Sequence, residues 1–192
     1  YMLCSAQDYH PGESGYQQHI WQATLGPDAV VFVSQPPCLN EENSHRPNAW
    51  HGNVALPRVA QWKDVLIAVH KLPDDDWLGF THAYWPVRAF DEHELREDAK
   101  GHVWAFARQG TGYIALTAAR GLEFITRGDN TYRELRSYGQ HNVWVCAMGR
   151  TALDGGADDA AGLLRVGAPG VPRGPLGGEA RAGTGDRRQG GG

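Results

Sequence analysis

The sequence has no long hydrophobic run and no cluster of positive charge. No stretch approaches the roughly 18 consecutive apolar residues that a membrane span needs, and no cationic start leads into an apolar signal segment. The 18 Lys and Arg are outnumbered by 22 Asp and Glu, and they form no run that could bind a phosphate backbone. We therefore expect neither a membrane nor nucleic acid as a partner.

Cysteine is scarce as well. Cys4, Cys38 and Cys146 are odd in number, far apart in the sequence and without a CxxC pair. This pattern favours neither a disulfide framework nor a zinc site built from thiolates. It leaves the redox compartment, and hence the localisation, undetermined.

Aromatic residues are missing from the C-terminal part of the chain. All 7 Trp lie before Val145, whereas residues 151–192 are rich in Gly and contain no aromatic side chain. Such a composition buries too little apolar surface to offset the entropy of ordering, so it predicts a folded domain over residues 1–150 and a disordered Gly/Pro-rich tail over 151–192. The tail is either a natural linker or a GC-rich gene translated out of frame after about Asp154. Because the sequence is already typical of a folded domain from Tyr1 onward, we expect a fragment of a larger chain.

Short runs of β-branched and aromatic residues between turn signals predict strands in the first 150 residues. The expected strands are Ala29–Val33, Val65–Leu72, Val103–Arg108, Tyr113–Ala118, Leu122–Thr126 and Asn142–Met148. The third and fourth form a hairpin around Gly110-Thr111-Gly112. The spacing predicts an all-β fold, an antiparallel β-sandwich of the supersandwich-like kind, in which only Glu92–Asp98 makes a short helical turn.

The most unusual stretch is the long loop Gln35–Asn53. Its polar and aromatic side chains are Asn40, Glu41, Glu42, Asn43, His45, Arg46, Asn48, Trp50, His51 and Asn53. These are the groups of a saccharide cleft, because hydroxyls need paired donors and acceptors, a sugar face stacks on a ring and Arg holds a uronate carboxylate. The candidate substrate-binding residues are Arg46, Asn48, Trp50, Asn53 and the more distant Trp85. The alternative is an ordinary surface loop whose Trp50 forms a lid on the core.

A metal site in this loop is not expected. His45 and His51 lie close enough in sequence to reach one ion, but no third strong ligand is evident. Hydrogen-bonding roles for both imidazoles are therefore favoured, and we predict no metal and no cofactor.

The segment Trp77–Pro86 supplies a second set of candidates. On a strand, His82 and Tyr84 share a face, and together they could act as general base and general acid. The alternative is an aromatic sheet face with a satisfied polar rim. His70, in an expected strand, is better explained as a core or edge imidazole.

Acidic residues give weaker signals. Asp74-Asp75-Asp76 lacks the ligand spacing of a calcium loop and predicts a solvated turn. Asp91, Glu92 and Glu94 could be the paired carboxylates of a glycosidase, although nothing in the sequence sets their separation.

Three segments carry a resemblance to a known family. They are YMLCSAQDYHPGESGYQQHIWQATLGPDAVVFV, HRPNAWHGNVALPRVAQWKDVLIAVHKLPDDDWLGFTHAYWP and VWAFARQGTGYIALTAARGLEFITRG. Over about Tyr1 to Asp154, the chain resembles the C-terminal part of large bacterial proteins of the heparinase II/III-like class. In that class a helical toroid precedes an antiparallel β-sandwich, and polysaccharides containing uronic acid are cleaved by β-elimination between the two.

The resemblance implies that this chain is mostly the sandwich. The toroid, which supplies the family's catalytic Tyr and the Asn or His that neutralises the uronate, has no counterpart in this sequence, and neither does the HxHxD-type sequence near the family's domain junction. The sandwich can offer one catalytic His and several sugar-contacting side chains. The first candidates are His45, Arg46, Trp50 and His51, followed by His82 and Tyr84. The implied partners are a polysaccharide and the helical domain of the same chain.

Three functions remain as hypotheses. The first is the sandwich part of a polysaccharide lyase that is inactive without its helical toroid domain. The second is a non-catalytic sandwich that binds carbohydrate or joins domains, for which exposed Trp50, Trp77 and Trp85 would be the evidence. The third is a fragment of a glycoside hydrolase, which requires two carboxylates set across a cleft.

Overall fold

The computed structural model describes residues 1–6, 9–12, 19–39, 49–50, 52–128 and 131–150. The expected tail over 151–192 lies outside this part of the chain, as do four candidate site residues, His45, Arg46, Asn48 and His51. No helix among the described residues is long and apolar enough to cross a membrane.

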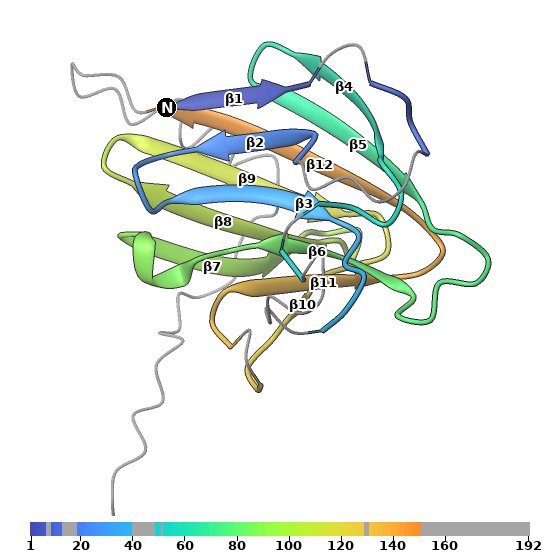
Figure 1. Cartoon of the computed structure of the whole chain (residues 1–192). Coiled ribbons are helices and arrows are strands. Elements are labelled where there is room, and N and C mark those ends of the chain that lie inside the picture. Colours follow the sequence, from blue (N-terminus) through green and yellow to red (C-terminus); the bar gives the residue numbers. More distant parts are fainter. Residues whose placement is uncertain (7–8, 13–18, 40–48, 51, 129–130, 151–192) are drawn as a thin grey trace, which may run out of the picture.

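The fold is an antiparallel β-sandwich of two six-stranded sheets (Figure 1), which confirms the predicted fold class. The first sheet consists, in spatial order, of β1 Met2–Ser5, β2 Trp21–Thr24, β3 Val30–Ser34, β6 Phe80–Tyr84, β11 Glu134–Tyr138 and β10 Glu123–Phe124. The second consists of β4 Arg58–Trp62, β5 Val65–Lys71, β12 His141–Arg150, β9 Gly112–Ala118, β8 Val103–Gln109 and β7 Glu92–Glu97. A single 3-10 turn, η1 Val87–Ala89, is the helical element of the described residues.

The alternation of buried and exposed side chains explains why the central segments form strands. Along β5, Leu66, Ala68 and His70 are buried while the residues between them are exposed, as a half-buried strand requires. The β8–β9 hairpin forms where it is predicted, and Gly110 closes it with a φ of +59°, a conformation that glycine adopts at little cost.

The expected helical turn over Glu92–Asp98 is wrong. Glu92–Glu97 is the edge strand β7, which pairs with β8 along its whole length. The charged residues Glu92, Glu94 and Arg96 share the outer face of this strand, while Leu95 packs on the core. Pairing with β8 therefore decides the conformation, although the charged composition favours a helical turn. The expected strand Leu122–Thr126 is shorter than predicted, since only Glu123–Phe124 pairs.

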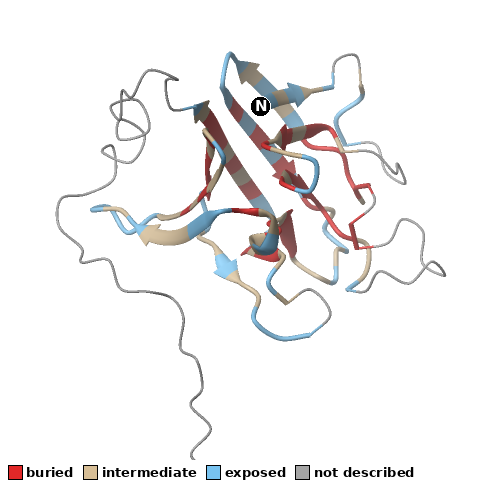
Figure 2. Cartoon of the chain, turned by 90° about the vertical axis from the view of Figure 1, so that its left-hand side faces the viewer, coloured by how far each residue is buried: buried red, intermediate tan, exposed pale blue. Residues whose placement is uncertain are grey.

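Three tryptophans, Trp21, Trp85 and Trp144, are buried in the core that both sheets share. Figure 2 shows buried residues alternating with more exposed ones along the strands. Trp85 is only 1% exposed and lies among Ala83, Phe90 and the other inward-facing residues. The expectation that Trp85 is exposed is therefore wrong, because the chain leaves β6 with this ring turned into the core.

One end of the core is polar. The Trp144 Nε1–H donates to Thr81 Oγ1 over 2.8 Å, and Asn142 Nδ2 donates to the same oxygen over 3.2 Å. His70 lies opposite Asn142 across the β5–β12 ladder and is 1% exposed, as a core imidazole should be. Neither of its ring nitrogens has a hydrogen-bond partner within the described part of the chain, and burial, with a smaller contribution from the charge of His82, lowers its pKa to about 3.

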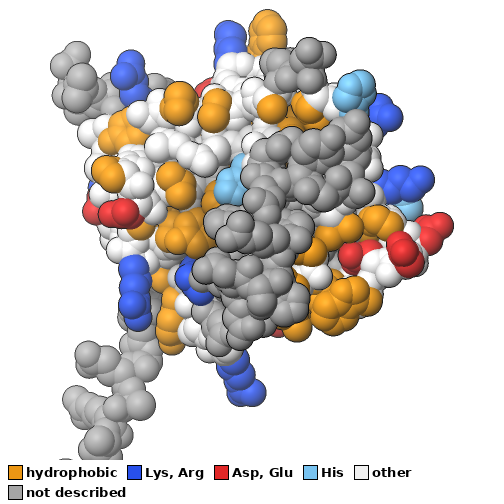
Figure 3. All heavy atoms as spheres, in the orientation of Figure 1, with side chains coloured by type: hydrophobic (Ala, Val, Ile, Leu, Met, Phe, Trp, Pro, Cys, Tyr) orange, Lys and Arg blue, Asp and Glu red, His pale blue; other side chains and the backbone are white. Residues whose placement is uncertain are grey.

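The outer face of the second sheet exposes a row of apolar side chains. Trp62, Val65, Ile67 and Val69, from neighbouring strands β4 and β5, form what we call the β4–β5 apolar face. Contiguous exposed apolar surface is unusual on a monomeric protein and marks an interaction surface. On the opposite side of the molecule, shown in Figure 3, the described Lys and Arg side chains stand singly rather than in one patch.

Candidate functional site

The candidate site is a row of polar side chains on the outer face of the first sheet. Ser34 on β3, His82 on β6 and Arg136 on β11 are direct neighbours across the three strands. Because cross-strand partners point to the same face, their side chains meet on the side away from the core. Glu134 lies two residues before Arg136 on β11 and therefore joins the same row.

The imidazole of His82 is bonded at both nitrogens. Its Nδ1 lies 2.8 Å from Oε1 of Glu134, and its Nε2 lies 3.1 Å from Oγ of Ser34. The Glu134 carboxylate is ionised and can only accept, so Nδ1–H is the donor to it. In the neutral ring, the Ser34 hydroxyl then donates to Nε2.

Arg136 holds Glu134 from the other side. Its Nε and Nη2 donate to the two carboxylate oxygens over 2.8 and 3.0 Å, a bidentate arrangement. Its guanidinium also lies 4.5 Å from the centre of the Phe80 ring. Burial acts to raise the pKa of Glu134, but the hydrogen bonds from His82 and Arg136 outweigh it and lower that pKa. The row therefore contains an ion pair whose carboxylate is buried and whose guanidinium is partly exposed.

Trp50 covers this row. Its indole lies flat on His82, with ring centroids 4.1 Å apart and planes inclined by 2°. Its edge meets Tyr84 and Phe32, and His19 Nε2 lies 2.8 Å from the Trp50 carbonyl oxygen. Trp50 is 5% exposed, so the expectation that it is exposed is wrong, because the sheet face beneath it is aromatic enough to bury it.

The segment that carries Trp50 is tied together at its two ends. The Gln35 N–H donates to Asn53 Oδ1 over 2.9 Å, and the Val54 N–H donates to the Gln35 carbonyl over 3.0 Å. Asp76 adds a further tie, accepting from the Gln35 side chain and from the Gly79 N–H. The sequence predicts only that Asp76 lies in a solvated turn. In the structure, its carboxylate also accepts the hydrogen bond from the Gln35 side chain at the base of the loop.

The structure brings together three of the candidate residues, Trp50, His82 and Tyr84. His82 and Tyr84 share the outer face of β6, as the strand period predicts. Among the described residues, none hydrogen-bonds to the Tyr84 hydroxyl, and the side chain is half-buried. Asn53 lies at the base of the loop, and its Oδ1 is engaged with the backbone. Trp85 points to the opposite face of the sheet.

The sequence alone does not single out Ser34, Glu134 or Arg136. Ser34 ends an apolar strand and carries no local signal. Glu134 and Arg136 have the period-two spacing of one strand face, but β11 contains only five residues and was not expected as a strand. The acidic residues proposed for a glycosidase lie elsewhere. Asp91, just before β7, and Glu92, at the start of β7, pair with Arg108 on β8.

The order Ser34–His82–Glu134 has the connectivity of a hydrolase triad. In such a triad the serine oxygen must be open to an acyl group and face donors for the oxyanion. Ser34 is fully buried at the last pair of the ladder between β3 and β6. Its hydroxyl therefore has a hydrogen-bonding role, whereas the half-buried Tyr84 on the same face is more exposed than Ser34.

No three His, Cys, Asp or Glu side chains of the described residues are grouped so that they could hold a metal ion. In comparisons with known proteins, no family model, curated protein or solved structure matches this sequence.

Proposed function

We propose that this chain is the β-sandwich part of a polysaccharide lyase that cleaves polysaccharides containing uronic acid by β-elimination, together with a helical domain. The observation that carries the proposal is the buried row of Ser34, His82, Glu134 and Arg136 beneath Trp50. It lies at the base of the loop in which the sequence places its saccharide-binding groups.

The row is difficult to explain by stability alone. Removing charges from water is costly, and replacing a buried ion pair by apolar residues is often neutral or stabilising. Glu134 and His82 are each about 1% exposed at the side chain, so both carry this cost. Buried titratable groups with specific charge partners are typical of functional sites, which supports a site on this face.

Elimination needs three kinds of group. A base removes the proton next to the uronate carboxyl carbon, a donor stabilises the charge that develops on the carboxylate, and an acid protonates the oxygen of the sugar that leaves. The carbon–oxygen bond breaks as the carbon–carbon double bond forms, so no oxidant or added water is consumed. Tyr84, with a hydroxyl free of described partners, suits the proton transfer.

The remaining roles fall on the rest of the loop. Trp50 is held flat on His82, and both ends of the segment are bonded at Gln35, so the loop leaves and rejoins the sheet at one place. We assign contact with the uronate carboxylate to Arg46, because guanidinium binds carboxylates bidentately, and hydroxyl contacts to Asn48. His45 and His51 are the further acid and base candidates.

The test is a search for the unsaturated product. The chain joined to its helical domain is incubated with a panel of uronic-acid polysaccharides, and ultraviolet absorbance of the new double bond is followed. The proposal expects product with at least one polysaccharide and none with neutral glucans. Absence of product across the panel, with a correctly folded protein, would contradict it.

A non-catalytic sandwich that joins domains is the second candidate, and the β4–β5 apolar face favours it. Four exposed apolar side chains on neighbouring strands are better suited to a protein surface than to a sugar. On this hypothesis, Ile67→Lys would prevent assembly with the helical domain, whereas Tyr84→Phe would change nothing. Product formation that depends on Tyr84 would decide against it.

A further inference from the structure

The β4–β5 apolar face continues across the second sheet. Cross-strand partners point to the same side of a sheet, so the register shows which residues of β12, β9 and β8 share this side. Two rows of such partners cross from β5 to β8. One row consists of Val65, Ala147, Ala115 and Phe106, and the next consists of Ile67, Val145, Thr117 and Trp104. The outer face of the second sheet is therefore apolar over at least four neighbouring strands.

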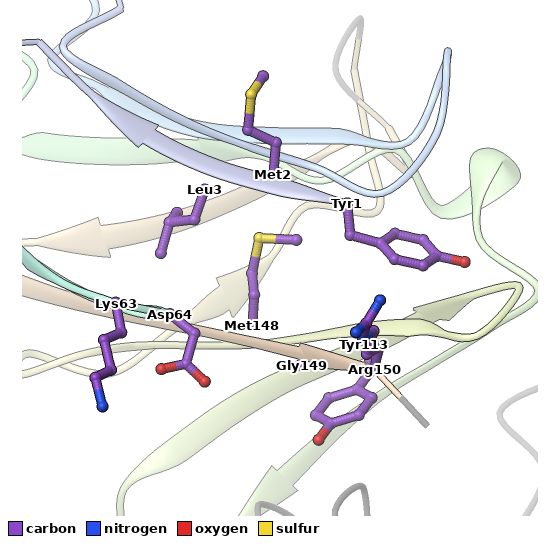
Figure 4. Close-up of a pocket in the computed structure, with 9 residues that line it drawn as sticks. All are labelled: Tyr1, Met2, Leu3, Lys63, Asp64, Tyr113, Met148, Gly149 and Arg150. Atoms are coloured by element: carbon purple, nitrogen blue, oxygen red, sulfur yellow. The ribbon is translucent and has the colours of Figure 1, made fainter. Parts of the chain in front are cut away.

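Figure 4 shows the two sides of this sheet near the β4–β5 turn. The side chains of Lys63 and Tyr113 project to one side, whereas the side chain of Met148 projects to the other, toward β1. Met148 belongs to the core, so Lys63 and Tyr113 lie on the outer face. The Lys63 ammonium lies 5.8 Å from the centre of the Trp62 ring, which places Trp62 on the same face.

This outer face is high along one half and low along the other. On β5, Val65, Ile67 and Val69 are branched and exposed. On β9, the outward-facing Ala115 and Thr117 have short side chains and are buried. A ridge along β5 therefore lies beside a trough along β9, and the aromatic rings of β8 form the far wall of the trough.

A twofold axis along β12 lets this face pack on a copy of itself. The rotation places β5 of one copy over β9 of the other, and β4 over β8, because these strands lie at equal distances on either side of β12. The ridge of each copy then enters the trough of the other, with Val65 over Ala115 and Ile67 over Thr117. At the edge, Trp62 reaches the aromatic rings of β8.

The charges at the two edges of the face suit the same arrangement. The β4–β5 edge has an excess of exposed cations over Asp64, and these cations are Arg58, Lys63 and Lys71. The β7–β8 edge has three carboxylates against two guanidinium groups, namely Asp91, Glu92 and Glu94 with Arg96 and Arg108. The twofold axis brings the positive edge of each copy to the negative edge of the other, and complementary potentials favour association.

The size of the face is sufficient for a dimer. Six strands span five spacings, or roughly 24 Å, and the seven-residue strands β5, β8 and β9 are about 23 Å long. Two such faces bury roughly 1,100 Å² in total before the relief of the side chains is counted. A specific interface needs about 1,000 Å².

We propose that the outer face of the second sheet is a homodimer interface, on which a second copy of this chain packs across a twofold axis along β12. The face matches its own rotated copy in relief and in charge, which a homodimer requires and an unrelated helical domain does not. The proposal does not depend on lyase activity, since the His82 row lies on the outer face of the other sheet.

The dimer predicts a cross-link that one copy cannot form. Lys63, in the β4–β5 turn, and Glu94, on β7, lie at least four strand spacings apart within a copy, or roughly 19 Å. In the dimer, Lys63 of one copy comes within about one strand spacing of Glu94 of the other, or roughly 5 Å. A carbodiimide joins an amine and a carboxylate directly. A Lys63–Glu94 amide, identified by mass spectrometry of the full chain, therefore links two copies, and Lys63→Gln should lose it while keeping the dimer.

Sedimentation velocity measures the association itself. The full chain should form a dimer that dissociates on dilution. Ile67→Lys and Val65→Lys should each weaken it by a factor of at least about 100, because each variant buries an unpaired ammonium beside the twofold axis. Trp77→Lys, at an exposed ring outside the second sheet, is the matched control and should leave the dimer intact. Circular dichroism checks that all three variants are folded.

Four outcomes would overturn the proposal. They are a parent chain that is monomeric up to its limit of solubility, a dimer that survives both lysine substitutions, a dimer that Trp77→Lys disrupts equally, and a dimer without the Lys63–Glu94 link. A monomeric parent that joins the helical domain and loses it on Ile67→Lys would instead favour the sandwich that joins domains.

Discussion

Trp50 lies flat on His82, with planes inclined by 2° and ring centroids 4.1 Å apart. The contact joins a loop residue to the central strand of the first sheet and seals a row of charged and polar groups from solvent. Because His82 is bonded at both ring nitrogens, its plane is fixed, and the indole above it is fixed in turn. The hydrogen-bonded imidazole of His82 thus positions Trp50, and with it the end of the loop Gln35–Asn53.

The first prediction concerns this stacking. Trp50→Ala should lower the free energy of unfolding by about 3–5 kcal/mol, because it opens a cavity over His82, Phe32 and Tyr84. Chemical denaturation monitored by circular dichroism measures the change. Trp77→Ala is the control, since Trp77 is 72% exposed and its loss should cost no more than about 0.5 kcal/mol. Equal losses for the two variants would contradict the assignment of Trp50 as the cover of the row.

The second prediction concerns the ion pair. Glu134→Gln should destabilise the fold by about 2–4 kcal/mol, because it leaves the Arg136 charge less compensated inside the sheet face. Glu92→Gln, which removes an exposed partner of Arg108, should have a much smaller effect. Denaturant midpoints of the two variants provide the comparison. A Glu134→Gln protein as stable as the parent would show that the carboxylate is not ionised in the folded state.

The third prediction is a pH dependence from His70. Its folded pKa of about 3 lies below the ordinary value of 6.5, so its contribution to stability is complete above pH 6.5 and is lost as the pH falls toward 3. In this window the free energy of unfolding should fall by about 1.4 kcal/mol per pH unit from this group alone.

His70→Leu isolates that effect. The variant should flatten the pH dependence between pH 6.5 and about 5.5, a range in which carboxylates of ordinary pKa stay largely ionised. It should also stabilise the protein at pH 7 by about 1–3 kcal/mol, since it removes buried nitrogens that lack partners within the described residues. An unchanged slope in denaturation curves would refute the assignment of a neutral core imidazole.

The fourth prediction separates the Ser34–His82–Glu134 row from a hydrolase triad. Ser34 should not react with a fluorophosphonate reagent, because its hydroxyl is fully buried. Ser34→Ala should cost about 1 kcal/mol of stability through the lost bond to His82 Nε2. Covalent labelling of Ser34, detected by mass spectrometry and absent in Ser34→Ala, would establish a nucleophile instead.

The sandwich fold can be predicted because the sequence patterns of its central strands are typical of β-strands. β5, β8, β9 and β12 alternate or consist of β-branched and aromatic residues, and Gly110 marks the hairpin. The charges of the edge strand β7 predict a helical turn, because charged side chains face solvent on a strand as readily as on a helix. Its identity depends on pairing with β8, which is a long-range contact.

The site was predictable only in part. The shared face of His82 and Tyr84 follows from the strand period, and Trp50 was already singled out within its loop. Ser34 and Glu134 could not be found, because their meeting with His82 depends on the order β3-β6-β11 in the sheet. The sequence does not show that Trp85 points into the core, because the orientation of this side chain depends on how the chain leaves β6.

The most direct measurement compares Tyr84→Phe with the parent protein, each joined to the helical domain that the proposed function requires, in the assay for unsaturated uronate product. The substitution removes one oxygen and keeps the ring between Phe32 and Trp50, so folding should be preserved. If Tyr84 transfers the proton, the kcat should fall by a factor of about 100 or more at unchanged melting temperature, while Tyr132→Phe, at an exposed ring, should retain full activity. A Tyr84→Phe enzyme as fast as the parent would contradict the placement of the chemistry on this face.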